Sequence, residues 1–214
     1  MKILNYNLNN YQALLFDLDG TVVNSVPIHD RAWIETFHEY GIVIDLQFLK
    51  ETTGMASTRI VKVVNEKFGV DLDPKTLSDK KRARYLENVE DVKLVGPVFE
   101  ILKAFHGKLP MGAITGGSHQ VVDFLLPKLG IAKYFQTVVC SDDTRNGKDS
   151  TEPYELACGN LKVEMNKCIF FDDGDIGLTG AKLSGMDIIQ VDIDRSDIFL
   201  HATIWCILIL KFKG

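Results

Sequence analysis

The amino-acid sequence predicts an α/β fold, a doubly wound parallel sheet with a small helical cap inserted after the first strand. Two patterns support this prediction. In the second half of the chain, short apolar runs typical of strands alternate with helical segments, and this alternation builds parallel sheets covered on both faces. Residues 28–95 instead contain successive helical patterns without a strand. The change from alternating strands and helices to helices alone indicates an insertion into the α/β core.

The strands of the sheet are expected where short apolar runs occur. These runs lie at 13–17, 111–115, 137–140, 168–172 and 187–191. Helical patterns separate the later runs, for example "HQVVDFLLPKLG" and "GLTGAKLSG". Each of these patterns ends in glycine, a frequent C-terminal signal of helices.

The inserted segment contains amphipathic helical patterns of its own. They lie at 28–41, 58–69 and 73–90, and the last begins with Asp73 followed by Pro74, the favoured order at a helix start. We expect Trp33, Phe37 and Phe68 to form the core of this segment rather than a sugar-stacking surface.

The predicted domains follow from the two connectors, residues 24–27 and 95–97. The core comprises residues 1–26 and 96–214, and the helical cap comprises residues 27–95.

Composition and charge narrow the class of protein. The chain has 214 residues, of which 46% are hydrophobic and 25% charged, and a net charge of −5. This balance is typical of globular proteins and argues against a general nucleic-acid binder. The N-terminus lacks the pattern of a secretion signal, so we expect a cytoplasmic protein, either a monomer or a weak homodimer.

The segment Ile198–Leu210 is almost continuously apolar. It is too short for a typical membrane span, which needs about 20 apolar residues. The prediction is that it packs on the sheet as an extra strand or helix. A dimer contact and a membrane surface are the alternatives.

Polar residues follow four of the expected strands. In open parallel sheets, ligands bind at the carboxyl ends of the strands, near the point where the strand order reverses. The residues expected at this edge are Asp17 and Asp19 after the first strand, Thr115 and Gly116 after the second, Lys148 beyond the third, and Asp172 and Asp173 after the fourth. We therefore expect them to meet in one site.

This set of side chains suits the transfer of a phosphoryl group. Carboxylates together with substrate phosphate and water are common ligands of Mg²⁺, and a cation with Lys148 offsets the charge on the phosphoryl oxygens. Asp17 is then available as a nucleophile. Residues two apart in an extended chain point the same way, so Asp19 can act beside it as general acid and base.

Four segments resemble the motifs of the haloacid dehalogenase superfamily, in their usual order. They are "DLDGTVVNS", the threonine of "AITGGS", the lysine of "RNGKDSTEPYELA", and "FFDDGDIGLTGAKLSGM". The resemblance covers residues 11 to 193. The cap resembles that of the β-phosphoglucomutase-like branch, and "HDRAW", "LDPKTL" and "FHGKLPMGAITG" are most similar to bacterial fructose-1-phosphate and 6-phosphogluconate phosphatases.

The resemblance implies a Rossmann-like core, a mobile helical cap and dependence on Mg²⁺. It implies that Asp17 is the nucleophile and Asp19 the acid/base, and that Thr115 and Lys148 hold the transferring phosphoryl group, with Gly116 beside them. The implied metal ligands are Asp17, the main-chain carbonyl of Asp19, Asp172 and Asp173. An acidic residue at the position of Asp19 argues against the dehalogenases themselves.

Several positions depart from the family pattern, among them the segment after Lys148. Lys148 is followed by Asp149, Ser150 and Thr151, where the family usually shows P-x-P. The loss of the prolines is expected to loosen this loop, and Asp149 could act on the charge of Lys148.

Three cap residues are candidates for contact with the substrate. His29 lies at the start of the first cap helix and resembles a histidine that β-phosphoglucomutases carry near the acid/base; the alternative is a half-exposed helix residue. Arg59 and Lys81 could hold a second phosphate or a carboxylate when the cap closes. The alternative for them is an ordinary charged helix face.

The function predicted from these observations is hydrolysis of small sugar phosphates by a Mg²⁺-dependent phosphatase through a phosphoaspartate intermediate. The partner is a small phosphorylated metabolite, with no nucleic acid and no membrane span. Two alternatives stay open. One is a sugar-phosphate mutase, which returns the phosphoryl group to the sugar. The other is a binding protein that kept the fold and lost turnover.

Overall fold

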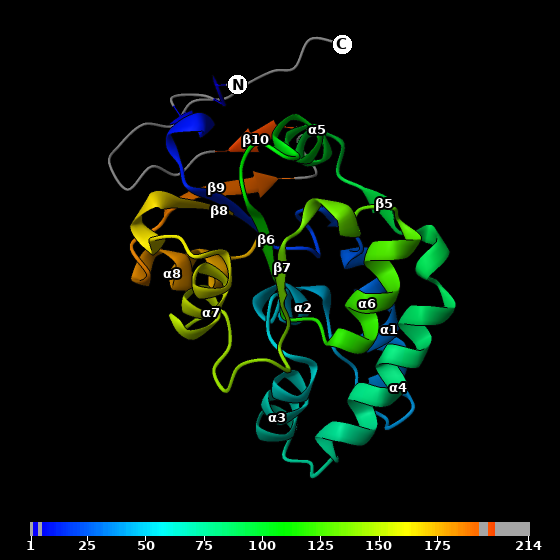
Figure 1. Ribbon diagram of the computed structural model, residues 1–214. Coiled ribbons are helices and arrows are strands. Elements are labelled where there is room, and N and C mark those ends of the chain that lie inside the picture. The colour runs from blue at the N-terminus through cyan, green and yellow to red at the C-terminus, as the bar shows by residue number, and fades with distance from the viewer. Residues whose placement is uncertain (1, 4–5, 193–196, 200–214) are drawn as a thin grey trace.

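A central β-sheet organises the computed structural model (Figure 1), which describes residues 2–3, 6–192 and 197–199. Within these residues the sheet has six strands in the order β10, β9, β8, β3, β6, β7. Their bounds are Ala13–Phe16 (β3), Met111–Ile114 (β6), Thr137–Val139 (β7), Cys168–Asp172 (β8), Asp187–Asp192 (β9) and Asp197–Phe199 (β10). Strand β10 is antiparallel to β9, and the other pairs are parallel. The predicted α/β fold is confirmed.

Strand β3 is the point at which the strand order reverses. The chain continues from β3 to β6 and β7 on one side, and β8 and β9 follow on the other side. Phe16 is in register with Ala113 of β6 and with Phe171 of β8. The residues that follow these strands therefore emerge at the same edge, where ligands of such sheets bind.

Helices cover both faces of the sheet. On one face, α5 (Gly96–Phe105) and α6 (His119–Lys128) pack against the side chains of Leu14 and Phe16. On the other, α7 (Glu152–Leu161) and α8 (Asp175–Leu183) pack against Ala13 and Leu15. All four residues of β3 are inaccessible to solvent, because successive side chains of a strand point to opposite faces and each face is covered.

The insertion forms a separate helical cap, which lies at the lower end of the view in Figure 1. Its helices are α1 (Val26–His38), α2 (Leu46–Glu51), α3 (Ser57–Phe68) and α4 (Pro74–Glu87). Trp33 and Phe37 are buried in its core, as predicted. The prediction for Phe68 is wrong, because its side chain is 40% exposed at the last position of α3.

The two chain crossings between core and cap are paired. Strands β4 (Val23–Asn24) and β5 (Lys93–Leu94) form a small antiparallel sheet, with Val23 opposite Leu94 and Asn24 opposite Lys93. The expectation of a strand-free segment from 28 to 95 is wrong in this detail. The pair lies next to the predicted connectors, and the domain boundaries stay a prediction.

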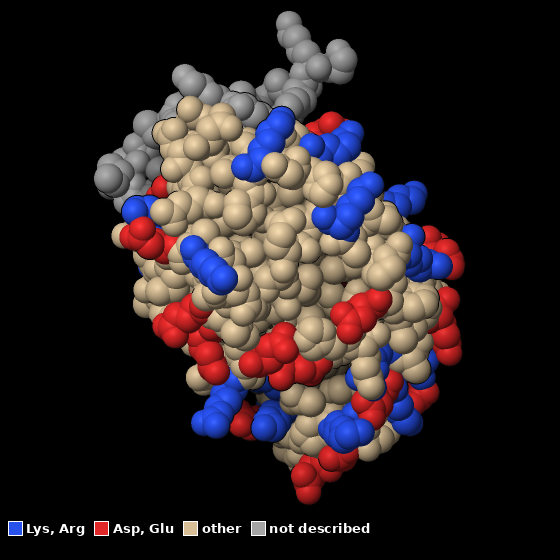
Figure 2. All heavy atoms as spheres, viewed as in Figure 1, with Lys and Arg blue, Asp and Glu red and all other residues tan. Residues whose placement is uncertain are grey.

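The remaining elements are short. They are β1 (Lys2–Ile3), β2 (Tyr6–Asn7) and the 3-10 helices Leu8–Asn10, Val89–Asp91, Ala132–Tyr134 and Met165–Lys167. In the part of the chain that the structure describes, every helix is too short or too polar to cross a membrane. The apolar tail lies outside the described residues after Phe199. On the face shown in Figure 2, acidic and basic side chains are interspersed, without a continuous basic surface.

Candidate active site

Three buried charges meet at the edge of the sheet beside β3. The Lys148 ammonium donates to Asp17 Oδ1 at 2.6 Å and to Asp172 Oδ2 at 2.8 Å. The three side chains are at most 5% exposed. Asp17 directly follows β3 and Asp172 ends the adjacent strand β8, whereas Lys148 lies in the loop between β7 and α7. The structure thus brings together three of the predicted residues.

Asp173 completes an acidic cluster with Asp17 and Asp172. Ligand atoms of these three carboxylates lie within 4.8 Å of one another, and Thr21 Oγ1 donates to Asp173 at 3.1 Å. Gly20 makes this approach possible, since it has a φ of +88° and a Cβ there would lie 2.3 Å from Asp173 Oδ2. A side chain at position 20 would push Asp173 out of the cluster.

The loop after β6 forms the second wall of the site. Thr115, Gly116 and Gly117 line the same pocket as Asp17 and Asp19. The Thr115 hydroxyl accepts a hydrogen bond from the Gly117 amide at 3.0 Å, which fixes the turn. The cap meets this turn directly, because a Cβ on Gly116 would lie 2.6 Å from the carbonyl oxygen of Gly54. The cap is therefore closed over the site.

Asp19 belongs to a different hydrogen-bond chain from Asp17. Its Oδ1 accepts from Ser25 Oγ at 2.5 Å and lies 3.0 Å from His29 Nε2. The other ring nitrogen, His29 Nδ1, is 2.5 Å from Lys81 Nζ. The ring of His29 also stacks on Tyr85 with centroids 4.0 Å apart. Two of the three predicted cap residues thus reach the site through Asp19.

Burial and mutual repulsion hold protons on the acidic cluster. The pKa of Asp17 is well above its ordinary value because burial outweighs the attraction of Lys148, and Asp172 and Asp173 add to the rise. Burial and the charge of Asp172 raise the pKa of Asp173 to about 7. The pKa of Lys148 is also raised, because Asp17 and Asp172 outweigh its own burial. If all three carboxyl groups lost their protons, they would carry more negative charge than the ammonium group of Lys148 can neutralise.

Asp19, in contrast to Asp17 and Asp173, has a lowered pKa and is ionised at neutral pH. Burial alone would raise its pKa, but the attraction of the pair formed by His29 and Lys81 and the hydrogen bonds from His29 and Ser25 outweigh burial, so the pKa of Asp19 is lowered. Burial and the nearby charge of Lys81 lower the pKa of His29. Burial also lowers the pKa of Lys81, to about 8. A charged Lys81 donating to a neutral His29, which in turn donates to Asp19, satisfies all three groups.

The acidic cluster fits a divalent cation such as Mg²⁺. Its ligands are carboxylate oxygens, which Mg²⁺ prefers, and the ligand atoms of Asp17, Asp172 and Asp173 lie within 4.8 Å of one another. Asp17, Asp172 and Asp173 would supply side-chain oxygens. The carboxylate of Asp19 is engaged with Ser25 and His29.

Arg59 lies apart from this pocket. It is absent from the residues that line the cavity around Asp17, and its Nη1 donates to Asp149 at 3.0 and 2.9 Å. Asp149 was expected to act on Lys148. The structure pairs it with Arg59 instead, whereas Lys148 bonds to Asp17 and Asp172.

Sequence reasoning missed the part of the cap that faces the catalytic residues. Thr52, Thr53 and Gly54 line the pocket from the loop after α2. The run "TTGM" between two helical patterns was the available signal, because hydroxyl groups and glycine together favour turns. Ser25 and Thr21 were also missed, although both belong to the first motif.

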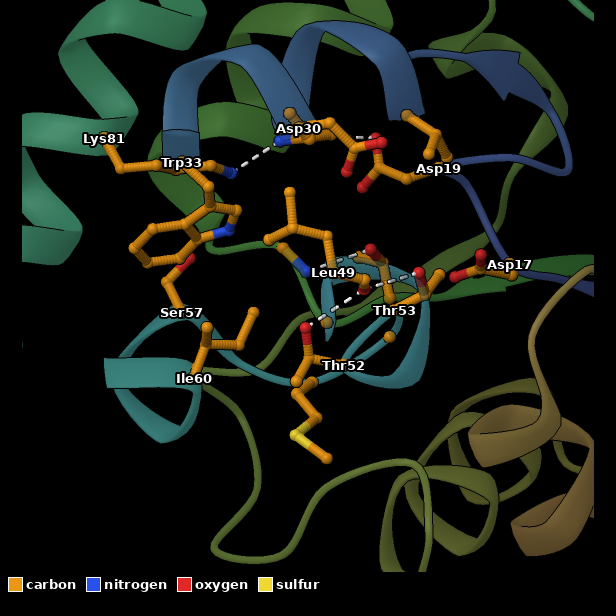
Figure 3. A pocket seen from close by; sticks show the side chains of 17 residues that line it. Asp17, Asp19, Asp30, Trp33, Leu49, Thr52, Thr53, Ser57, Ile60 and Lys81 are labelled. Atoms are coloured by element: carbon orange, nitrogen blue, oxygen red, sulfur yellow. Dashed lines mark hydrogen bonds and ion pairs between the residues drawn. The ribbon is translucent and has the colours of Figure 1, made fainter. Parts of the chain in front are cut away.

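The pocket combines an apolar wall with polar groups (Figure 3). Trp33, Leu49 and Ile60 come from the cap helices and lie opposite Asp17 and Asp19 across the cavity. The cavity holds about 90 Å³, which is small beside the roughly 300–1,000 Å³ of small-molecule sites. The enclosed space suits a phosphoryl group, and a larger ligand requires the cap to move.

Comparison with known proteins identifies the family. The sequence pattern described as "Haloacid dehalogenase-like hydrolase" matches residues 14–191. The chain belongs to the haloacid dehalogenase-like hydrolases. Among the relatives of this hydrolase is fructose-1-phosphate phosphatase YqaB of Escherichia coli, 33% identical over 185 residues that cover 85% of this chain and 96% of the relative. The phosphatase-named relatives support phosphatase activity for this chain.

A second relative and a solved structure are also similar to this chain. The 6-phosphogluconate phosphatase of Escherichia coli is 26% identical over 188 residues, which cover 85% of this hydrolase and 82% of the relative. The crystal structure of β-phosphoglucomutase from Clostridium difficile superimposes with a TM-score of 0.75 at 21% identity, covering 85% of both chains. The structural similarity shows the fold, an α/β core with a helical cap.

Proposed function

We propose that this hydrolase is a Mg²⁺-dependent phosphatase that acts on small sugar phosphates through a phosphoaspartate on Asp17. The observation that carries the proposal is the position of Asp17. Its carboxylate lies at the reversal point of the sheet, bonded to Lys148 and beside Asp172 and Asp173. Asp19 stands in the same enclosed pocket.

In the first step, a carboxylate oxygen of Asp17 attacks phosphorus and the bond from phosphorus to the sugar oxygen breaks. Asp19 gives the departing oxygen its proton. Asp19 is ionised in the free protein, and a bound phosphate dianion raises the pKa of a neighbouring carboxyl. Substrate binding itself therefore favours the protonated acid. Thr115 and Lys148 hold the phosphoryl oxygens during transfer.

In the second step, Asp19 accepts a proton from a water molecule whose oxygen attacks the phosphorus of the phosphoaspartate. The bond from phosphorus to Asp17 breaks, and phosphate and the free carboxylate are restored. His29 donates to Asp19 and limits the directions in which its carboxylate can turn. Lys81 holds the tautomer of His29 in which Nε2 carries the proton.

A Mg²⁺ ion held by Asp17, Asp172 and Asp173, with the main-chain carbonyl of Asp19, would supply positive charge against the phosphoryl oxygens. The acidic cluster supports this assignment, because it groups three carboxyl side chains around the single ammonium group of Lys148, which bonds to two of them.

The pocket supports a sugar as the rest of the substrate. Leu49 and Ile60 offer apolar surface, and Ser57 offers a hydroxyl group. Sugars present both kinds of surface. The name of one relative, fructose-1-phosphate phosphatase, agrees with this substrate class.

A screen of sugar phosphates with and without Mg²⁺ tests the proposal. We expect phosphate release from at least one hexose phosphate, lost after removal of Mg²⁺ with a chelator and regained on its return. Measuring isomerised sugar phosphate in the same samples separates hydrolysis from mutase activity. Isomerisation without phosphate release, or no turnover of any phosphate ester, contradicts the proposal.

A further inference from the structure

An ion pair joins the cap to the loop that carries Lys148. Arg59 on α3 of the cap donates from Nη1 to both carboxylate oxygens of Asp149, at 3.0 and 2.9 Å, across 90 residues of sequence. The two side chains are 46% and 40% exposed. Ion pairs with this exposure contribute little to stability, so the effect of this pair on local charge matters more than its effect on folding.

The ion pair lies in a second cavity beside the catalytic pocket. This cavity holds about 610 Å³ and includes Arg59 and Asp149 in its lining. It shares Thr115, Gly116 and Gly54 with the catalytic pocket. Gly54 of the cap contacts this turn directly and separates the two cavities in the closed structure. When the cap moves, the far end of a substrate whose phosphoryl group lies against Asp17 and Thr115 would enter the second cavity.

Cationic side chains make this cavity attractive to a second anion, and Asp149 opposes that attraction. Arg59, Lys62 and Arg145 line it together with Lys148. Lys148 is bonded to Asp17 and Asp172, and Arg59 is bonded to Asp149. A second phosphate or a carboxylate on the substrate would have to displace Asp149 from Arg59 and lie beside its negative charge. Like charges brought together at a binding site lower affinity.

We propose that Asp149 selects substrates with one phosphate group and an uncharged far end, by occupying the Arg59 side chain against a second anionic group. The inference rests on the proposed phosphatase function. Sugar monophosphates are favoured, whereas sugar bisphosphates and phosphorylated sugar acids are disfavoured.

The same residue would favour hydrolysis over a mutase cycle. A mutase passes through a sugar bisphosphate, because the phosphoryl group on Asp17 is transferred to a second hydroxyl of a sugar that already carries a phosphate. This intermediate has a second phosphate remote from Asp17. With Arg59 paired to Asp149, that phosphate lacks this cation as a partner, and water remains the better acceptor.

The test compares fructose 1-phosphate with fructose 1,6-bisphosphate, which differ only in the second phosphoryl group. In the Asp149→Asn variant we expect the KM for the bisphosphate to fall about tenfold, the size expected for a charge contact of about 1.4 kcal/mol. The KM for the monophosphate should change less than about twofold, since a contact with only the second phosphate leaves it unaffected. Adding Arg59→Gln to Asp149→Asn should cancel the gain.

The matched control is Asp142→Asn, which removes the same charge from the same loop at a residue that bonds to the amide of His119 instead of to Arg59. Equal changes in KM for both sugars, or an equal effect of Asp142→Asn, would overturn the inference. Its failure is separable from failure of the proposed function. Calorimetric dissociation constants of the two sugars, measured in the Asp17→Asn variant with and without Asp149→Asn, decide the selectivity even if the wild-type protein releases no phosphate.

Discussion

Lys148 Nζ lies 2.6 Å from Asp17 Oδ1, and both side chains are almost completely buried. The ammonium group holds the carboxylate in place at the end of β3 and also bonds to Asp172. Because the pKa of Lys148 is raised, it stays charged throughout the physiological range. Lys148 therefore holds Asp17 in position for attack, while burial and the neighbouring carboxylates raise the pKa of Asp17.

Asp17→Asn tests covalent catalysis. The amide keeps the size of the side chain but cannot attack phosphorus as a carboxylate does. We expect kcat to fall by at least about a thousandfold, as for loss of a nucleophile in other enzymes. Phosphate release gives kcat, and circular dichroism checks the fold. Unchanged hydrolysis in a folded variant would refute the phosphoaspartate intermediate.

The pH dependence of stability tests the charge of the metal-free cluster. Asp173 has a pKa of about 7 in the folded protein, against an ordinary value of 3.8. Between these values the folded protein holds a proton that the unfolded chain has lost, so the free energy of unfolding falls as the pH rises from about 4 to about 7. For one group the slope is at most about 1.4 kcal/mol per pH unit.

Urea unfolding at several pH values, in the presence of a chelator, measures this slope. Asp173→Asn should flatten the profile over that window and raise stability at its upper end. Asp175→Asn is the control, since Asp175 lies on the first turn of α8 outside the acidic cluster. A wild-type profile that is flat or rises over this window would contradict the raised pKa of Asp173.

Lys81 is expected to set the alkaline limit of activity. Its pKa is lowered to about 8, and above that pH it no longer holds His29 Nδ1 as a cation. Activity should therefore decline as the pH rises through about 8. Lys81→Met should lower kcat at neutral pH and remove this decline, and Lys81→Arg should move the decline to higher pH.

The matched control for Lys81 is Lys80→Met on the same helix, because Lys80 is exposed and pairs with Glu39. A pH profile of kcat for the four proteins distinguishes the outcomes. If Lys81→Met keeps the alkaline decline of the wild type, another group is responsible for it.

Gly20→Ala is expected to damage both stability and the metal site. The residue has a φ of +88° and no room for a Cβ beside Asp173, whereas Gly41 has a φ of +71° with open space around it. Gly41→Ala therefore reports the backbone strain alone, about 1 kcal/mol. Gly20→Ala should lose more than that and bind Mg²⁺ more weakly. Chemical unfolding and calorimetric titration with Mg²⁺ measure the two effects, and equal losses in both variants would argue against the contact with Asp173.

The core site could be predicted from the sequence because parallel strands deliver their carboxyl ends to one edge. Once Asp17, Thr115 and Asp172 are assigned to strand ends, their meeting follows from the register of three adjacent strands. The contact of Lys148 with Asp17 does not follow in this way, since Lys148 lies on a loop nine residues beyond β7. The assignment of Lys148 to the site came from its position between the second and fourth motifs of the family that the sequence resembles.

The cap was predictable as a set of helices, but its inner face was not. Helical periodicity does not reveal which face of α3 or α4 turns toward the core, so Arg59 and Lys81 were equivalent candidates. In the structure Lys81 reaches His29, and Arg59 is held by Asp149. The rotation of each helix depends on packing between cap and core, which involves residues distant in sequence.

The pairing of β4 with β5 has a consequence for how such a protein can be re-engineered. Both chain crossings leave the core at one small sheet, where Val23 faces Leu94. The segment between them begins and ends at almost the same point, so it forms a closed unit. A different helical segment with matching ends could be exchanged there while the strands that carry the catalytic carboxylates keep their places. Such a graft would also replace His29 and Lys81, so the new segment would have to supply its own hydrogen bond to Asp19.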